Sequence, residues 1–194
     1  MKHVPVQRNA GQPIKLIHNE RIAKRTIIAF TDASIRKHGS GVGVASRSSD
    51  DGYVSQTTLR AKHAATRDIN ELEMSSIFIA LETADHAADI VVYTDSQTAI
   101  DQVTGATATK KYDRLARLIR RVAESRRGSA SICKVKAHSG NEGNELADAL
   151  AAEGTFSAYA IDLPRDGDDL SAWRERHVGE EHAMCVVREK RTDA

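Results

Sequence analysis

The chain has 194 residues, and its 28 Lys and Arg residues nearly balance its 27 Asp and Glu residues, which leaves a formal net charge of +1. Hydrophobic residues make up 40% of the chain and charged residues 28%, a composition typical of a globular protein of one ordinary domain. This balance excludes a protein that holds a polyanion through its net charge alone. A polyanionic ligand would need a local basic patch or a bound metal ion.

The cellular compartment is indicated by two negative features of the sequence. No apolar run is long enough for a signal peptide or a membrane span. Cys133 and Cys185 are the only cysteines and lie far apart, which favours a reduced protein without disulfide bonds. We therefore expect a cytoplasmic protein with no membrane partner.

The first half of the chain is rich in strand signals. A short strand is expected at Ile14–Ile17, and Thr26–Thr31 is an apolar, β-branched run typical of a central strand. Two more strands are predicted around Val42–Val44 and Tyr53–Leu59, joined by a turn at Asp50–Gly52.

From residue 68 onward, helices alternate with two strands. The helices are marked by apolar residues that recur every three or four positions, and the strands by short apolar runs. Ser96 is a candidate N-cap, and Gly105 ends the short helix that follows it. In chain order we predict a helix at Asp68–Ala88, a strand at Ile90–Tyr93, helices at Ser96–Val103 and Lys110–Arg126, a strand at Ser131–Ala137 and a helix at Asn141–Glu153.

This order of elements predicts an α/β fold with helices around a mixed sheet. We expect one domain at residues 22–154. Residues 1–21 would form an N-terminal arm, and residues 155–194 a charged C-terminal extension.

Three acidic residues occupy positions where the predicted fold gives them a shared environment. Asp32 follows the first central strand and Asp95 the fourth strand, so parallel pairing would place both at the carboxyl edge of the sheet. Taken singly, either aspartate is better explained as an ordinary turn residue. Glu73 shares a helix face with Ile77 and Ala80, where it would be desolvated against the sheet; alone, it is equally well explained as a boundary residue that reaches water near the helix start.

Asp148 lies on the last predicted helix, and His138 in the loop before it. Alone, each favours a solvated surface. Together, four carboxylates at one edge would repel each other, by roughly 4 kcal/mol for two charges about 4 Å apart at an effective dielectric of about 20. Such a cluster persists around cations, and an all-oxygen set selects Mg²⁺ or Mn²⁺.

Four motifs carry a resemblance to the type 1 ribonuclease H family. The order Asp, Glu, Asp, His, Asp matches the family, as does the step of ten residues from His138 to Asp148. The resemblance covers about residues 24–154. Its motifs are Phe30-Thr31-Asp32-Ala33-Ser34, Asn70-Glu71-Leu72-Glu73-Met74, Tyr93-Thr94-Asp95-Ser96-Gln97, and His138-Ser139-Gly140 followed by Asn144-Glu145-Leu146-Ala147-Asp148.

The resemblance implies a ribonuclease H-like fold with a five-stranded mixed sheet and helices on both faces. It implies an endonuclease that hydrolyses the RNA strand of RNA–DNA hybrids by two-metal-ion catalysis and leaves 3′-hydroxyl and 5′-phosphate ends. Asp32, Glu73, Asp95 and Asp148 would hold two Mg²⁺ ions, for which Mn²⁺ can substitute. His138 would assist proton transfer or product release.

Candidate substrate contacts come from two sources. Ser34, Asn70 and Gln97 match family positions beside the hybrid. On the helix at 110–126, Arg114 and Arg117 belong to a basic stripe, for which a solvated surface is the favoured interpretation and phosphate contact the alternative. We expect a monomer, with the C-terminal extension as a candidate surface for a protein partner.

Two other functions are compatible with this fold. A non-catalytic binding module should have lost an acid, whereas all four are present. A DNA-directed nuclease of the same superfamily is the second; its proofreading members carry Glu where Ser34 stands here. The sequence also departs from the family, with Ala33 in place of a common Gly and Ile69 in place of a polar residue before Asn70.

Overall fold

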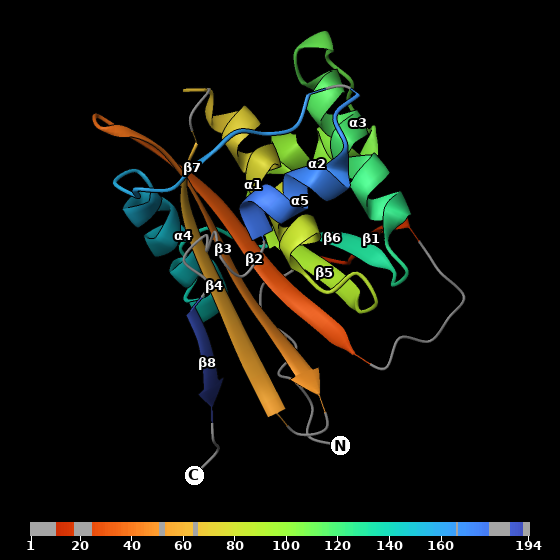
Figure 1. Ribbon diagram of the computed structural model, residues 1–194, viewed down its shortest axis with the longest axis vertical. Coiled ribbons are helices and arrows are strands. Elements are labelled where there is room, and N and C mark those ends of the chain that lie inside the picture. The colour runs from red at the N-terminus through yellow and green to blue at the C-terminus, as the bar shows by residue number, and fades with distance from the viewer. Residues whose placement is uncertain are drawn as a thin grey trace.

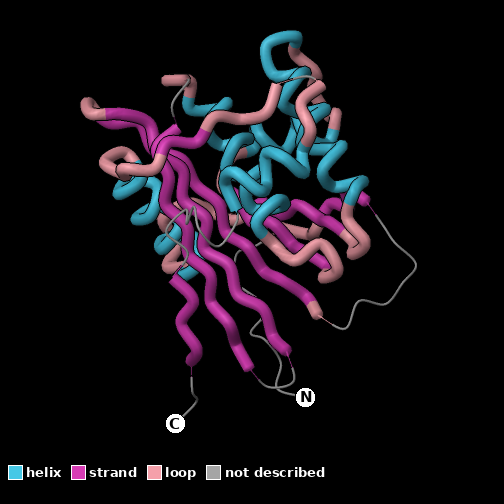
Figure 2. Tube along the Cα trace, in the orientation of Figure 1, coloured by secondary structure: helices cyan, strands magenta, loops and turns pink. Residues whose placement is uncertain are grey.

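The computed structural model describes residues 11–17, 25–50, 53–63, 66–165, 167–178 and 187–191. One sheet runs through it in the strand order β1-β6-β5-β2-β3-β4-β7, and β8 pairs with β4 (Figures 1 and 2). The strands are β1 (Ile14–Ile17), β2 (Thr26–Arg36), β3 (Gly39–Asp50), β4 (Tyr53–His63), β5 (Asp89–Thr94), β6 (Ala130–Lys134), β7 (Ala160–Ile161) and β8 (Val187–Arg191). The helices are α1 (Ile69–Thr83), α2 (Gln97–Thr104), α3 (Lys110–Ser125), α4 (Glu142–Gly154) and α5 (Leu170–Val178).

The predicted five-stranded mixed sheet is confirmed as the centre of this larger sheet. β2, β5 and β6 are parallel, whereas β2, β3 and β4 form an antiparallel meander. The short β1 lies at the residues where a strand was predicted, and it pairs antiparallel with β6. β7 and β8 both pair with β4. Part of the turn predicted at Asp50–Gly52, residues 51 and 52, lies outside the described residues.

Helices cover both faces of the sheet, as predicted. The side chains of β2 alternate between the two faces, so Ile27 and Ala29 join the larger core beneath α1, while Phe30 packs with Ala147 of α4 on the opposite face. Figure 1 shows α1, α2, α3 and α5 grouped together and α4 set apart from them.

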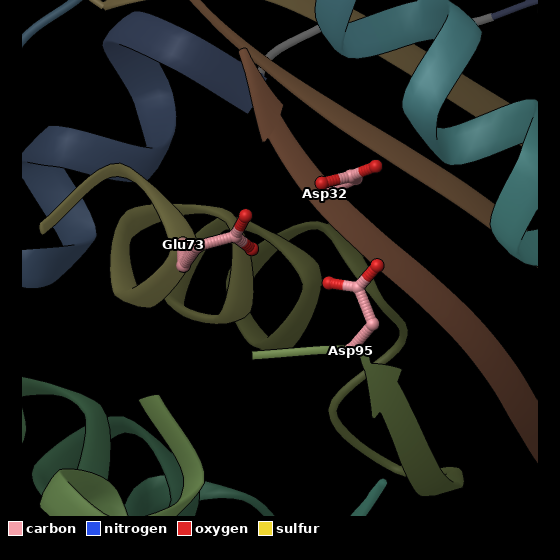
Figure 3. A group of neighbouring side chains, drawn as sticks. All are labelled: Asp32, Glu73 and Asp95. Atoms are coloured by element: carbon pink, nitrogen blue, oxygen red, sulfur yellow. The ribbon is translucent and has the colours of Figure 1, made fainter. Parts of the chain in front are cut away.

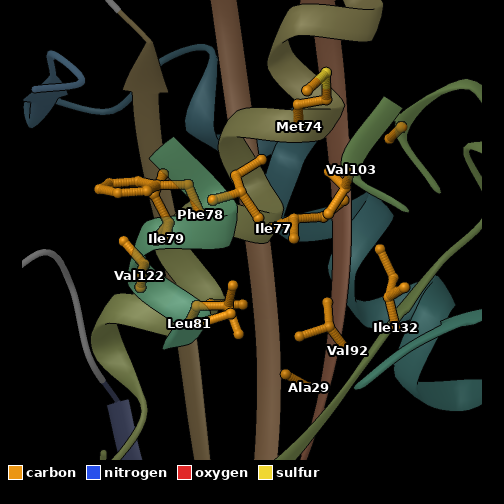
Figure 4. Close-up of a cluster of buried hydrophobic side chains, with 14 of the residues drawn as sticks. Ala29, Met74, Ile77, Phe78, Ile79, Leu81, Val92, Val103, Val122 and Ile132 are labelled. Atoms are coloured by element: carbon orange, nitrogen blue, oxygen red, sulfur yellow. The ribbon is translucent and has the colours of Figure 1, made fainter. Parts of the chain in front are cut away.

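Helix α1 is the centre of the larger core. Every residue from Leu72 to Glu82 is buried, because the helix lies between the sheet and the other helices of that face (Figure 4). Trp173 of α5 is fully buried there, with its ring 4.9 Å from that of Phe78. Helix α5, within the segment expected as a charged extension, therefore contributes to this core. The boundary at residue 154 stays a prediction.

The helix α1 ends at Thr83, earlier than the predicted end at Ala88. Ala84 has an extended backbone, and the buried guanidinium of Arg126 donates hydrogen bonds to the carbonyls of Leu81 and Ala84. These carbonyls would otherwise be left without partners at the end of the helix. A residue remote in sequence thus helps to stop α1.

Two glycines of β3 allow α4 to approach the sheet closely. A Cβ atom on Gly43 would lie 2.1 Å from the carbonyl oxygen of Ala147, and one on Gly41 would lie 2.2 Å from that of Ala151. Only residues without side chains fit at this distance. The contact holds α4, and Asp148 on it, against the sheet.

Within the described part of the chain, none of the helices combines the length and the apolar character needed to cross a bilayer.

Candidate active site

Asp32 and Asp95 lie where two parallel strands separate. The pairing of β2 with β5 runs from Thr26–Asp89 to Thr31–Thr94, and β5 ends there. The sequence had suggested that Asp32 follows its strand. β2 instead continues to Arg36 along β3, so Asp32 lies within the strand. Asp32 and Asp95 are the next residues after the last pair, which places them side by side at the carboxyl edge of the parallel strands.

Glu73 approaches the two aspartates from α1. The helix begins at Asp68, whose side chain accepts a hydrogen bond from the Asn70 N–H at 3.0 Å. Glu73 is 7% exposed, so its predicted burial is confirmed. Asp32, Glu73 and Asp95 each offer an oxygen atom, and these atoms lie within 4.8 Å of one another (Figure 3).

Burial and mutual repulsion disfavour negative charge in this cluster. Burial, with the charges of Asp95 and Asp148, raises the pKa of Asp32 to about 6, although the Ala33 N–H donates to its carboxylate at 2.7 Å. Burial, with the charges of Asp32 and Asp95, raises the pKa of Glu73 to about 10. The buried Oε2 atom of Glu73 finds no hydrogen-bond partner among the described residues.

These features fit a divalent cation. A cation would compensate the desolvated carboxylates, and a ligand set made only of oxygen atoms matches Mg²⁺ or Mn²⁺. Lys134 of β6 donates a hydrogen bond to the main-chain carbonyl of Asp95 and so helps to hold that residue in position.

Asp148 and His138 occupy less enclosed positions. Asp148 is half-buried on α4 and lies outside the group of three, but its charge contributes to the raised pKa of Asp32. His138 is exposed in the loop before α4 and has a φ of 46°, in the left-handed region. The Gly140 N–H donates to Glu145 at 3.1 Å, which ties this loop to the first turn of α4.

The candidate substrate residues are differently placed. Ser34 is buried on β2, on the same strand face as Asp32. The side-chain amide of Asn70 donates to the Tyr112 hydroxyl at 3.4 Å, and that of Gln97 to Asp101 at 2.8 Å.

The basic stripe of α3 is engaged within the protein. Arg114 is half-buried and donates to the Pro164 carbonyl at 2.8 Å, and Arg117 forms an ion pair with Asp113. The exposure of Arg117 agrees with the solvated surface that the sequence favoured, whereas the half-buried Arg114 makes a contact within the protein that it did not suggest. Substrate contact by either arginine stays a prediction.

One part of the site was not predicted. Asp68, at the start of α1, accepts a hydrogen bond from the Tyr112 hydroxyl at 3.0 Å and pairs with Lys111 at 2.6 Å. The Lys111 ammonium, with the Tyr112 hydroxyl, lowers the pKa of Asp68. This contact fixes the start of the helix that carries Glu73. Its partners are more than 40 residues apart, so local sequence patterns give no signal for it.

Fold and site together define an α/β protein with an acidic centre suited to a divalent cation. A model of the RNase H family matches residues 24–156, which is more than half of the chain. The chain therefore belongs to the ribonuclease H family, and the predicted assignment to a family of enzymes is confirmed.

Relatives support this assignment by their sequences and by their solved structures. The ribonuclease H of Chromohalobacter salexigens is 35% identical over 116 residues, which cover 54% of this chain and 70% of that protein. The structure of RNase H1 from the halophilic archaeon Halobacterium salinarum is 30% identical, with a TM-score of 0.54, and the match covers 69% of this chain and 99% of that one. LC9-RNase H1, described as a type 1 RNase H with the type 2 active-site motif, has a TM-score of 0.58 over 84% of this chain and 87% of its own; at 18% identity it supports the fold alone.

Proposed function

We propose that this protein is an endonuclease that hydrolyses the RNA strand of RNA–DNA hybrids and leaves 3′-hydroxyl and 5′-phosphate ends. The observation that carries this function is the convergence of Asp32, Glu73 and Asp95 from three different elements of a ribonuclease H fold. The charged groups with the largest effects on Asp32 and Glu73 are other carboxylates. Without a cation such a cluster opposes folding, which suits a site that binds cations.

Two Mg²⁺ ions would be held by Asp32, Glu73 and Asp95, with Asp148 approaching from α4, and Mn²⁺ could substitute. Such ions supply an activated water and neutralise the leaving oxygen of a phosphodiester. The three carboxylates orient the reacting groups, because each is fixed by its own element. Their burial also excludes water and strengthens electrostatic interactions at the edge of the sheet.

The remaining residues would bind the hybrid and move protons. Asn70 and Gln97 carry amides that can hydrogen-bond 2′-hydroxyls and base edges in a minor groove, and Ser34 lies beside Asp32 on the strand. Arg114 and Arg117 would meet phosphates farther from the cut. His138, on its exposed loop, would carry a proton to or from the reacting oxygens.

A cleavage assay with four substrates tests this function. Uniformly labelled RNA–DNA hybrid, double-stranded RNA, double-stranded DNA and single-stranded RNA are each incubated with Mg²⁺, Mn²⁺ or EDTA. We expect efficient cleavage of the hybrid alone, at internal positions of its RNA strand, and none in EDTA. Equal cleavage of double-stranded DNA would instead support a DNA-directed nuclease. Tight hybrid binding without any cleavage would support a non-catalytic module.

A further inference from the structure

A surface depression lies beyond the acidic site, at the C-terminal ends of β2 and α4. This depression, of about 530 Å³, lies between the β2–β3 turn and the C-terminal end of α4, at the upper left of Figure 1. It is lined by Arg36, Lys37, His38, Ala152, Glu153 and Phe156. Its residues are outside the acidic site, and the proposed function gives them no role.

Phe156 is the most prominent member of this lining. Its side chain is 68% exposed, more than any other large hydrophobic side chain in the described part of the chain. The ring of His38 lies 5.0 Å from it at an interplanar angle of 39°. Phe156 therefore presents an aromatic face at the surface, beside a second aromatic ring.

The two sides of the depression differ in charge. Arg36, at the end of β2, and Lys37, in the turn, are exposed, and Arg67 donates to the main-chain carbonyl of Arg36 at 3.0 Å, which adds a third cation nearby. The opposite side is the C-terminal end of α4, where the helix dipole is negative and Glu153 lines the depression. A ligand in this depression would place an anionic group at the turn and a neutral, flat group on Phe156.

Two elements, β2 and α4, run from the acidic site to the depression. Asp32, Ser34 and Arg36 alternate on one face of β2, so Arg36 lies about 13 Å along the strand from Asp32. On α4, Ala152 lies one turn beyond Asp148, and Phe156 follows just after the helix end. A nucleic-acid strand that crosses the site would reach the depression in about four steps of ~3.4 Å axial rise.

We propose that this depression binds an unpaired nucleotide in a strand that extends beyond the hybrid. Its base stacks on Phe156, and its phosphate meets Arg36 and Lys37. The nucleotide must be unpaired because a base inside a duplex is covered on both faces by its stacked neighbours. An aromatic surface beside cations is the arrangement by which proteins hold single strands with little sequence preference. This inference rests on the proposed function, since the hybrid must first lie at the acidic site.

Fluorescence anisotropy on the 194-residue chain, made catalytically inactive by Asp95→Asn, tests this subsite without turnover. The probes are a blunt hybrid, hybrids with an RNA or a DNA extension at either end, and single-stranded RNA. We expect an extension on one side to tighten binding, and Phe156→Ala to weaken binding of that probe by about 5- to 100-fold while the blunt hybrid is unaffected. Phe156→Trp should retain the effect. Lys37→Gln should reduce the salt dependence for the extended probe alone.

The matched control is Tyr159→Ala, which removes another exposed aromatic ring, 47% exposed, that does not line the depression. It should bind all probes as the parent does. Equal affinity of Phe156→Ala and its parent for every extended hybrid would overturn the subsite, and so would an equal loss on blunt and extended hybrids. If the wild-type enzyme cuts no hybrid, the proposed function fails; the single-stranded RNA probe then still decides whether Phe156 binds an unpaired base.

Discussion

Helix α1 carries two buried glutamates that have opposite surroundings. Glu82 is 3% exposed, and Arg174 of α5 donates to both of its carboxylate oxygens, through Nε and, at 3.3 Å, through Nη2. His86 lies 3.6 Å from the same carboxylate. Glu73, nine residues earlier, is 7% exposed and faces Asp32 and Asp95 instead.

The difference separates a structural charge from a functional one. A buried carboxylate must be protonated, paired with a cation or bound to a metal. The protein supplies the cation for Glu82 from its own chain, and this pair attaches α5 to α1. For Glu73 it supplies more carboxylates, which leaves compensation to a proton or to a bound metal ion.

The largest expected effect is on catalysis. Glu73→Gln keeps the size of the side chain but removes a ligand charge, and we expect kcat for hybrid cleavage to fall by at least about 10³-fold, equivalent to roughly 4 kcal/mol. Asp95→Asn and EDTA should act similarly. The matched variant Glu82→Gln should stay within about threefold of wild type, because metal ligation does not involve it. Equal losses for Glu73→Gln and Glu82→Gln would contradict the distinction between a functional and a structural glutamate.

The next effect is on stability. Removing the charge partner of Glu82 and neutralising Glu73 should change the free energy of unfolding in opposite directions. Arg174→Met leaves Glu82 buried without its main partner, and we expect the free energy of unfolding to fall by about 2–3 kcal/mol. The estimate is below that for a fully buried pair because the Arg174 side chain is 29% exposed. Glu73→Gln should instead stabilise the metal-free protein at neutral pH by at least about 1 kcal/mol, because the buried glutamate must take up a proton to fold and a neutral glutamine need not. Urea titrations in EDTA measure both changes, and destabilisation by Glu73→Gln would contradict this account.

The dependence of stability on pH sharpens the same contrast. The raised pKa values mean that Asp32 and Glu73 keep protons in the folded, metal-free protein at pH values where the unfolded chain has lost them. The folded state then binds more protons, so these groups make stability fall as pH rises through about 4 to 6 for Asp32, and further toward about 10 for Glu73. Between about pH 4 and 7 we expect Asp32 alone to account for a loss of about 1–3 kcal/mol.

Because other carboxylates also titrate, the measurement is the difference between wild type and Asp32→Asn in urea titrations at several pH values in EDTA. The substitution should flatten the decline. Saturating Mg²⁺ should stabilise the wild-type protein most at the upper end of this range, where the carboxylates must ionise to bind it. A difference independent of pH would show that Asp32 ionises normally.

The smallest effect concerns His138, which lies outside this contrast on an exposed loop. Bulk water can partly replace an exposed proton carrier, so we expect His138→Ala to lower kcat by about 10- to 100-fold with KM nearly unchanged. Because the backbone φ is 46°, His138→Asn is the control that removes the imidazole with less strain. If the Asn variant alone retains full activity, the loss in Ala reflects the backbone. If both variants are as inactive as Asp95→Asn, His138 is an obligatory catalyst.

Local sequence patterns predicted most of the elements because their causes lie within a few residues. Ser96 caps α2 through the Ala99 N–H, and Gly105 ends it with a φ of 80°. The order of Asp32, Glu73 and Asp95 along strands and a helix also predicted their convergence. The end of α1 and the continuation of β2 to Arg36 were not predicted, because the first depends on Arg126 and the second on pairing with β3.

The sequence by itself determined the α/β order of elements, the acids of the candidate site and the family, since each depends on residue type and spacing along the chain. Only the tertiary structure decided which buried glutamate is compensated. Glu73 and Glu82 lie in the same continuous buried stretch of α1, and Arg174 is 92 residues from Glu82 in the sequence. Electrostatic compensation depends on distance through space and on the solvent excluded around the charge, so a charge partner that far along the chain is decided by packing.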